Sequence, residues 1–199
     1  MTQPTAAPTT TVTANKPSGL RSLYLIRAIF SLIWVALVVT TSASLKSADT
    51  PTVVAAGLFI VYPLWDAVAT LLERRLAGTG APRRVGIVNI ALGLAATIGM
   101  IIAVFSTIGT VLLVFGIWAL LSGAIQLAVA AGRRRTVGAQ WPMIISGGLS
   151  VLAGAAFAAM SGSATSGLSA VAGYSAFGAF WFLASAIVLS IRTRRAEVE

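Results

Sequence analysis

Long apolar stretches alternate with short polar segments along the chain from residue 21 onward. Each stretch has at least 21 residues, which is enough for a helix to cross a hydrocarbon core of about 30 Å. Most stretches are apolar around the whole helix, and none shows the strict alternation of a membrane β-strand. The pattern predicts an all-α, polytopic membrane protein with six transmembrane helices. The six stretches are 22–45, 51–72, 85–105, 110–131, 140–161 and 170–191.

The polar segments between the stretches group the helices into pairs. Arginine-rich segments follow the second and fourth stretches, whereas the connections inside each pair carry almost no charge. We therefore predict a membrane domain at 21–192 that is built from three repeated helical hairpins. The hairpins are expected at 21–75, 84–134 and 140–192. A disordered tail rich in Thr, Pro and Ala is expected at 1–20, and a short tail at 193–199.

The charged residues indicate how the helices are oriented. The chain has 14 Lys and Arg against 5 Asp and Glu, a formal net charge of +9. Twelve of the basic residues lie in the tails or between hairpins, and Lys46 alone lies on the opposite side. Because all the loops are short, the positive-inside rule predicts that both termini are cytoplasmic, in the inner (plasma) membrane. The arginine clusters are expected to contact anionic lipid, and they are too short to predict a nucleic-acid partner.

The first apolar stretch also allows a different interpretation. Residues 28–39 form a short apolar core that is followed by small residues at 40–44, as in a secretory signal peptide. The long segment before this core, and Arg27 directly next to it, favour a retained transmembrane helix. The repeat described next favours it further.

Small residues recur at intervals of seven within four of the helices. Seven residues are about two helical turns, so the two members of each pair lie on one face, where they let helices approach closely. Gly86 and Gly147 are separated by 61 residues, and Gly123 and Ser185 by 62, which supports a repeat. The predicted helix-packing pairs are Gly86 with Gly93, Gly116 with Gly123, Gly147 with Gly154, and Gly178 with Ser185.

Two charged residues, Arg27 and Asp66, fall inside the first hairpin at the positions that small residues occupy in the others. Arg27 lies six residues after Arg21 and Asp66 eight residues before Arg74, so both are expected at similar depths on adjacent antiparallel helices. We predict that they form a salt bridge in place of close glycine packing. Glu73 lies at the membrane boundary and is interpreted as a solvated residue.

Asn89 and Gln126 are expected at a depth comparable to that of the charged pair. Buried polar groups are costly in lipid unless they are paired, so Arg27, Asp66, Asn89 and Gln126 are predicted to form one polar layer that satisfies its members mutually. This layer has two interpretations, which the sequence leaves open. It holds the helices together, or it is the inner end of a polar pathway. The deeper tryptophans, Trp118 among them, are interpreted as packing residues.

The chain has no Cys and no His. A Ser-His-Asp triad, a thiolate nucleophile, an iron–sulfur cluster and histidine-ligated zinc or haem are therefore excluded. Phosphate-cradling motifs are also absent, because the Gly147–Gly148 pair lies inside an apolar stretch. We predict no catalytic residues, no metal and no cofactor, and we expect the protein not to be an enzyme.

A family resemblance lies mainly in residues 85–195. It is carried by a Gly-x-Trp and Ser-Gly pattern followed by arginines, in FGIWALLSGAIQLAVAAGRRR (115–135), MIISGGLSVLAGAAF (143–157) and FGAFWFLASAIVLSIRTRR (177–195). The first hairpin matches mainly in YPLWDAVATLLERR (62–75). These segments resemble the HdeD-like acid-resistance proteins, which are six-helix bacterial inner-membrane proteins.

The resemblance implies a non-enzymatic role in acid or envelope stress tolerance. We expect such a protein to act by association, with itself as a homo-oligomer or with another membrane protein. The alternative is a small transporter or channel that uses Asp66 as an ion- or proton-binding group. The two hypotheses differ in whether the protein moves a solute or a proton across the membrane.

Overall fold

The computed structural model describes the backbone of residues 17–42, 50–77, 83–134 and 141–162, with the side chains of most of them, and single residues or short runs between 171 and 191. Its five complete helices are α1 (Pro17–Ser42), α2 (Val53–Ala77), α3 (Arg83–Ala103), α4 (Ile108–Arg133) and α5 (Trp141–Met160). Further helical residues, including 178–184, form what we call the C-terminal helical segment. The described residues contain no strand, which confirms the all-α class.

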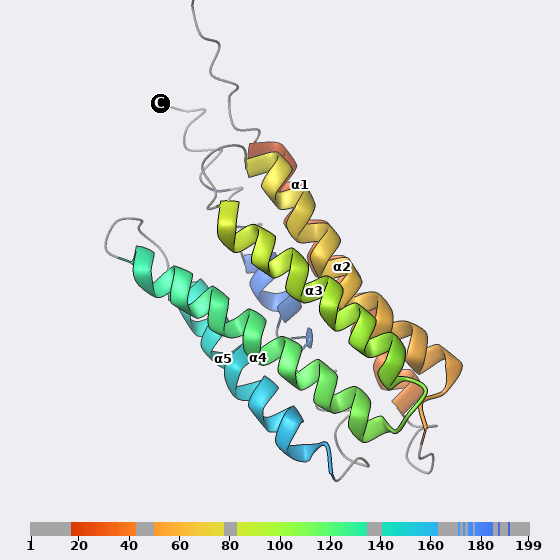
Figure 1. The fold of residues 1–199 in the computed structure, drawn as a ribbon. Coiled ribbons are helices and arrows are strands. Elements are labelled where there is room, and N and C mark those ends of the chain that lie inside the picture. The colour runs from red at the N-terminus through yellow and green to blue at the C-terminus, as the bar shows by residue number, and fades with distance from the viewer. Residues whose placement is uncertain are drawn as a thin grey trace, which may run out of the picture.

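All five complete helices are long and apolar enough to cross a membrane, and they run as one antiparallel bundle (Figure 1). Many large apolar side chains point outward; Val53 is 91% exposed and Phe105 87%. Outward-facing apolar surface of this extent suits contact with lipid, so the five helices support the prediction of a multi-pass membrane protein. The predicted sixth span at 170–191 is described only in part.

Two helix boundaries differ from the prediction. Residues 17–20, predicted to be part of a disordered tail, form the first turn of α1, which begins at Pro17. Proline suits this position because its fixed φ matches the helix and its missing N–H would be unpaired there in any case. Helix α2 continues to Ala77, so Glu73 lies within the helix. Residues 1–16 and 192–199 lie outside the described part of the chain.

The basic residues gather at one end of the bundle, which we call the basic end. Arg21 lies near the start of α1 and Arg74 near the end of α2 at this end. Here, too, α3 begins at Arg83 and α4 ends at Arg133 (Figure 1). At the opposite end, α3 and α4 are joined by an uncharged connection at 104–107. The uneven distribution of basic residues that the sequence indicated is therefore also seen between the two ends of the described bundle.

The half of the bundle away from the basic end is filled by an aromatic cluster around Phe115 of α4, which is fully buried. Its ring centroid lies 5.9 Å from Phe59, 6.0 Å from Tyr62, 6.4 Å from Trp34 and 6.0 Å from Phe157. These rings come from α1, α2 and α5, and most of the contacts are tilted or edge-to-face, as aromatic pairs prefer. The cluster therefore joins four helices in one apolar core.

Helices α4 and α5 pack backbone against backbone at the four predicted glycines. A methyl group added to Gly116 would lie 2.7 Å from the carbonyl oxygen of Gly154, and one added to Gly123 would lie 2.8 Å from that of Gly147. Because no side chain separates the two backbones, the helices approach more closely than larger residues would allow. These four glycines therefore lie at the close contact between α4 and α5.

The remaining predicted packing residues differ in how closely a neighbouring helix approaches them. A methyl group on Gly93 of α3 would lie 2.9 Å from Cβ of Ala67 in α2, whereas one on Gly86 would meet only the flexible side chain of Arg74. At Gly178 the nearest atom of a described residue is the hydroxyl of Tyr62 at 3.9 Å, an ordinary contact distance, so the described residues show no close packing there. Ser185 lies outside the described residues.

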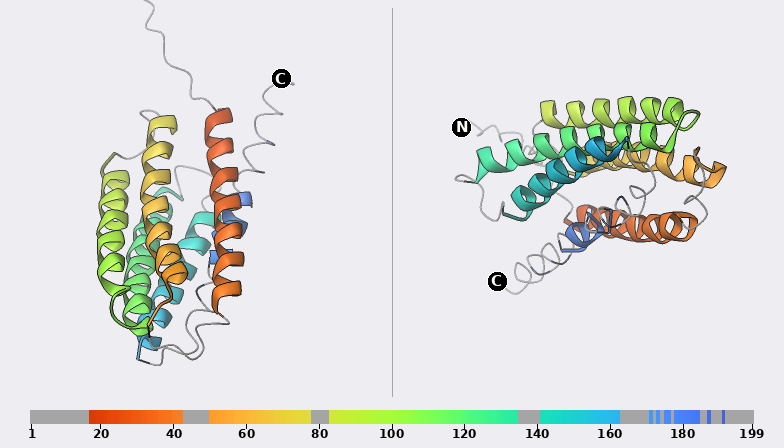
Figure 2. Two further views of the ribbon diagram at one scale, coloured as in Figure 1. Left: turned by 90° about the vertical axis from the view of Figure 1, so that its right-hand side faces the viewer. Right: turned by 90° about the horizontal axis from the view of Figure 1, so that it is seen from below.

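Among the five complete helices, the closest packing does not follow the predicted hairpins. Helix α4 packs most extensively on α5, and α2 on α3, so the tightest contacts cross the boundaries between hairpins. Helix α1 contacts α2 less extensively and lies with the C-terminal helical segment on one side of the bundle (Figure 2).

Candidate functional site

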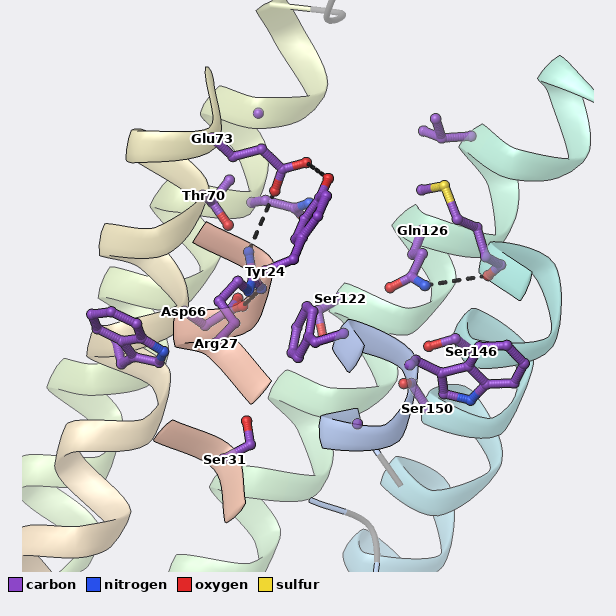
Figure 3. A pocket seen from close by; sticks show the side chains of 18 of the residues that line it. Tyr24, Arg27, Ser31, Asp66, Thr70, Glu73, Ser122, Gln126, Ser146 and Ser150 are labelled. Carbon is purple, nitrogen blue, oxygen red and sulfur yellow. Dashed lines mark hydrogen bonds and ion pairs between the residues drawn. The ribbon is translucent and has the colours of Figure 1, made fainter. Parts of the chain in front are cut away.

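A cavity of about 390 Å³ lies between the helices in the half of the bundle nearest the basic end (Figure 3). Every complete helix and the C-terminal helical segment contribute to its wall. Most lining residues of each complete helix belong to the half nearer the basic end, whereas Ser31, Tyr62 and Trp118 lie just beyond the middle of their helices. The lining lies within 24–31 on α1, 62–74 on α2, 85–89 on α3, 118–129 on α4 and 143–150 on α5. The cavity and the aromatic cluster therefore occupy opposite halves of the bundle, and Tyr62 and Trp118 belong to both.

The predicted salt bridge between Arg27 and Asp66 is present in the wall of this cavity. Nη2 of Arg27 lies 2.6 Å from Oδ1 of Asp66. The arginine side chain is 9% exposed and the aspartate side chain 27%, so the carboxylate keeps access to the cavity. Oppositely charged side chains at this distance form a strong hydrogen bond as well as an ion pair.

Glu73 joins this ion pair, and its side chain is 35% exposed, so it keeps the access to solvent that its boundary position predicts. Its Oε2 lies 3.4 Å from Nη1 of Arg27, and its Oε1 accepts a hydrogen bond of 2.8 Å from the hydroxyl of Tyr24. The signal for this contact is spacing, because Glu73 follows Asp66 by seven residues and so lies on the same face of α2. Two carboxylates of α2 therefore face one guanidinium of α1.

The guanidinium of Arg27 also contacts an aromatic ring. Its central carbon lies 4.2 Å from the ring centroid of Phe182, which belongs to the C-terminal helical segment. A cation at this distance over a ring is attracted by the negative face of the π system. Arg27 thus links α1, α2 and the C-terminal helical segment at one point of the cavity wall.

Asn89 and Gln126 line the same cavity but do not bond to the charged residues. Nε2 of Gln126 donates a hydrogen bond of 3.2 Å to the backbone carbonyl of Met143. Oδ1 of Asn89 is buried and has no hydrogen-bond partner within the described part of the chain. The structure therefore brings the four residues of the predicted polar layer to one cavity, but not into one hydrogen-bonded network.

The cavity wall also contains buried tryptophans whose indole N–H groups are unpaired. Nε1 of Trp65 and Nε1 of Trp118 make no hydrogen bond to any described residue. Trp118 is 6% exposed, and its ring packs against Tyr62 at 5.8 Å. Sequence reasoning interpreted Trp118 as a packing residue and missed its place in this wall, since no pattern in the sequence indicates which packing residues also line a cavity.

Among the described residues, no group of three or more acidic, histidine or cysteine side chains is placed to hold a metal ion. The cavity offers instead two carboxylates, two guanidiniums, several hydroxyls and a wall of aromatic rings. Such a surface is suited to binding a small polar or charged molecule by ion pairs, hydrogen bonds and ring contacts.

Comparisons with protein-family models, with curated proteins and with solved structures gave no match to this chain.

Proposed function

We propose that this protein is a small transporter or channel in which the cavity receives the transported species and Asp66 binds an ion or a proton. The observation that carries this proposal is the position of the Arg27–Asp66 pair in the wall of a cavity between apolar helices. Ionisable residues within membrane spans are costly and commonly mark the pathway of an ion or a substrate.

The shape of the cavity supports transport rather than passive packing. Its lining extends to Arg74 and Val85 at the basic end and stops at Tyr62 and Trp118, where the aromatic cluster begins. A polar cavity that ends at an apolar barrier suits a protein that admits a solute from one side at a time. Arg27 holds the carboxylate of Asp66 while no solute is bound.

The proposal includes an orientation and a membrane. By the positive-inside rule, the basic end faces the cytoplasm, and both termini lie on that side of the inner membrane. The exposed arginines Arg21, Arg75 and Arg84 then meet the anionic lipid headgroups of the cytoplasmic leaflet.

The test is flux into proteoliposomes that contain the full chain. Proton entry is followed with an enclosed pH-sensitive dye, and solute entry by light scattering after an osmotic step. We expect wild-type vesicles to exceed protein-free vesicles and Asp66→Asn to lower the flux to the protein-free level. The control is Arg75→Gln, which neutralises an exposed charge outside the cavity wall and should leave the flux unchanged.

The double variant Arg27→Gln/Asp66→Asn separates transport from folding. Removing both charges avoids an unpaired buried charge, so the double variant should fold better than either single variant while remaining inactive. Flux of wild-type protein no greater than that of empty vesicles would contradict the proposal, and so would full flux in Asp66→Asn.

A second candidate is the non-enzymatic, HdeD-like role in acid or envelope stress tolerance. The observation that favours it is that the predicted polar layer does not form one hydrogen-bonded network. Gln126 bonds to the backbone of α5, and Oδ1 of Asn89 has no described partner. This role predicts no flux, and a growth defect of the deletion strain at low pH but not at neutral pH. Complementation by Asp66→Asn protein would then indicate a function that is independent of transport.

A further inference from the structure

We propose that Glu73 collects protons for the cavity, and that the ion moved by this protein is a proton. Glu73 takes the proton from solution at the basic end and passes it to Asp66, while Arg27 stays paired with whichever carboxylate is ionised. This proposal rests on the proposed function, because it names the ion and a second residue that binds it.

Glu73 lies closer to the solution at the basic end than Asp66 does. It follows Asp66 by seven residues, which places it about 10 Å nearer the basic end along the axis of α2. Both side chains line the cavity, and that of Glu73 is the more exposed, at 35% against 27%. A proton that enters from the basic end therefore meets Glu73 first.

The charges at the basic end give a carboxylate a specific use there. Among the described residues, Asp66 and Glu73 are the only acidic side chains, whereas arginines lie at the basic end of α1, α2, α3 and α4. A cluster of positive charge repels hydronium ions, and a carboxylate within it offsets this repulsion and raises the local proton concentration. Glu73 is the described carboxylate that is placed to do this.

The guanidinium of Arg27 contacts the two carboxylates unequally. Its Nη2 lies 2.6 Å from Oδ1 of Asp66, and its Nη1 lies 3.4 Å from Oε2 of Glu73. Hydrogen bonds between an N–H cation and a carboxylate are usually about 2.7–2.9 Å long, so Arg27 stabilises the ionised form of Asp66 more than that of Glu73. A hydronium ion therefore gives its proton to Oε2 of Glu73 and leaves as water. This step takes the formal charge of one guanidinium and two carboxylates from −1 to zero.

The second step moves the proton from Oε2 of Glu73 to Oδ2 of Asp66. This oxygen makes no hydrogen bond to a described residue, whereas Oδ1 accepts one from Arg27. As Glu73 ionises again, Nη1 of Arg27 closes the 3.4 Å gap and pairs with it. Arg27, whose side chain is 9% exposed, is therefore never left as an unpaired buried charge. The formal charge of the three groups stays at zero throughout this step.

A polar side chain lies between the two carboxylates. Thr70 follows Asp66 by four residues and precedes Glu73 by three, so all three share one face of α2, and all line the cavity (Figure 3). A hydroxyl group can accept one proton while it donates another, which suits a position along a proton path. Tyr24 donates a hydrogen bond of 2.8 Å to Oε1 of Glu73, and Oε2 is left to face Arg27.

The other ionisable groups of the cavity wall do not compete for this proton. They are Tyr24, Tyr62 and Arg74, which keep their protons at neutral and mildly acidic pH, and the described lining residues of α3, α4, α5 and the C-terminal helical segment have none. A metal cation needs several oxygen ligands, and the described residues hold no group of three acidic side chains. A proton needs one lone pair, so it is the ion that these carboxylates suit.

The first experiment measures proton flux into proteoliposomes of the full chain after a pH step. Glu73→Gln keeps an amide oxygen for Tyr24 and leaves the 2.6 Å contact of Arg27 with Asp66 in place, so it should fold. We expect it to lower the flux at least about tenfold, because the group that collects and transfers the proton is gone. Glu73→Asp keeps a carboxyl group and should stay within about threefold of wild type. The matched control is Arg75→Gln, at an exposed position outside the cavity wall, which should leave the flux unchanged.

The second experiment needs neither a variant nor flux. Dicyclohexylcarbodiimide reacts with protonated carboxyl groups in apolar surroundings, and mass spectrometry of peptides from the labelled wild-type chain identifies the residue. We expect the labelling of Glu73 to exceed that of Asp66 at mildly acidic pH and to fall as the pH is raised.

The proposal is overturned if Glu73→Gln moves protons as fast as wild type, if Glu73→Asp is as slow as Glu73→Gln, or if the carbodiimide labels Asp66 and not Glu73. The two proposals fail separately. Wild-type vesicles without flux contradict transport, and the labelling then decides which of the two carboxylates binds the proton. Flux that requires Asp66 but not Glu73 supports transport and contradicts the collecting role of Glu73.

Discussion

The guanidinium of Arg27 lies 2.6 Å from the carboxylate of Asp66, and this contact joins α1 to α2 across the wall of the cavity. Elsewhere in the bundle, helices are joined by glycines, as at Gly123 and Gly147, where the backbones of α4 and α5 touch. The bundle thus uses two kinds of helix contact, one electrostatic and one steric. The first is accessible from the cavity and the second is not.

The Arg27–Asp66 pair should respond to substitution as a coupled pair. Arg27→Gln or Asp66→Asn alone should lower the free energy of unfolding in detergent by about 2–3 kcal/mol, because each leaves a largely buried charge without its main partner. The double variant should lose less than the sum of the two single variants. Additive losses in a double-mutant cycle would show that the pair is not coupled.

Gly154→Ala should destabilise the α4–α5 contact by about 1–3 kcal/mol, because the new methyl group would overlap the backbone of Leu120 and Gly116. Gly148 lies on the same helix with nothing within 4 Å of its Cβ position. Gly148→Ala should therefore be neutral or slightly stabilising, since alanine favours helix. The measurement is thermal unfolding of both variants in the same detergent, and equal melting temperatures would refute the glycine contact.

Gly178→Ala should be tolerated even though this glycine occupies a repeat position. The nearest atom to its Cβ position is the Tyr62 hydroxyl at 3.9 Å, so a methyl group fits without rearrangement. Gly116→Ala, at the equivalent repeat position in α4, would put a methyl group 2.7 Å from the backbone nitrogen of Ala158. Thermal unfolding should show a loss in the second variant only; a comparable loss in both would favour the repeat over the observed contacts.

Tyr24→Phe should destabilise the protein by about 1 kcal/mol, because it removes the 2.8 Å hydrogen bond to Glu73 while keeping the ring. The loss should disappear when Glu73 is already replaced by Leu, which offers no acceptor to the tyrosine hydroxyl. Unfolding free energies of the two single variants and the double variant test this dependence, and an undiminished loss in the double variant would assign the effect to packing.

Phe182→Leu should cost about 1 kcal/mol, since it removes the ring that lies 4.2 Å from the guanidinium carbon of Arg27. Phe180→Leu is the control, because Phe180 is 57% exposed and its described ring contact is with Trp181 instead. The effect of Phe182→Leu should shrink in an Arg27→Gln background. A loss of the same size in that background would mean that the ring acts only as apolar bulk.

Much of the fold follows from the pattern of apolar residues, because membrane helices must satisfy all their backbone groups internally and must be long enough to cross the core. The Arg27–Asp66 contact was predictable for a related reason. Two opposite charges at matching depths in apolar helices have few other ways to be satisfied. The glycines of α4 and α5 were predictable because small residues on one face have no other use in lipid.

The remaining features depend on rotations and helix lengths that the sequence leaves undetermined. Glu73 was assigned to the boundary because α2 was predicted to end at residue 72, whereas the helix continues to Ala77 and turns Glu73 toward Arg27. The partner of Gln126 is a backbone carbonyl of α5, which residue types alone do not reveal. The repeat does not predict which helix packs against each glycine. That partner follows from the extensive packing of α4 on α5.

The aromatic cluster around Phe115 has an electrical consequence. Under the proposed transport function, solution that enters the cavity from the basic end carries the potential of that side as far as Tyr62 and Trp118, so the membrane voltage falls mainly across the apolar half of the bundle. Arg27 and Asp66 then lie where this voltage drop begins. Passage of an ion beyond Phe115 would then be the step that senses voltage, by about 2.3 kcal/mol per elementary charge for each 100 mV.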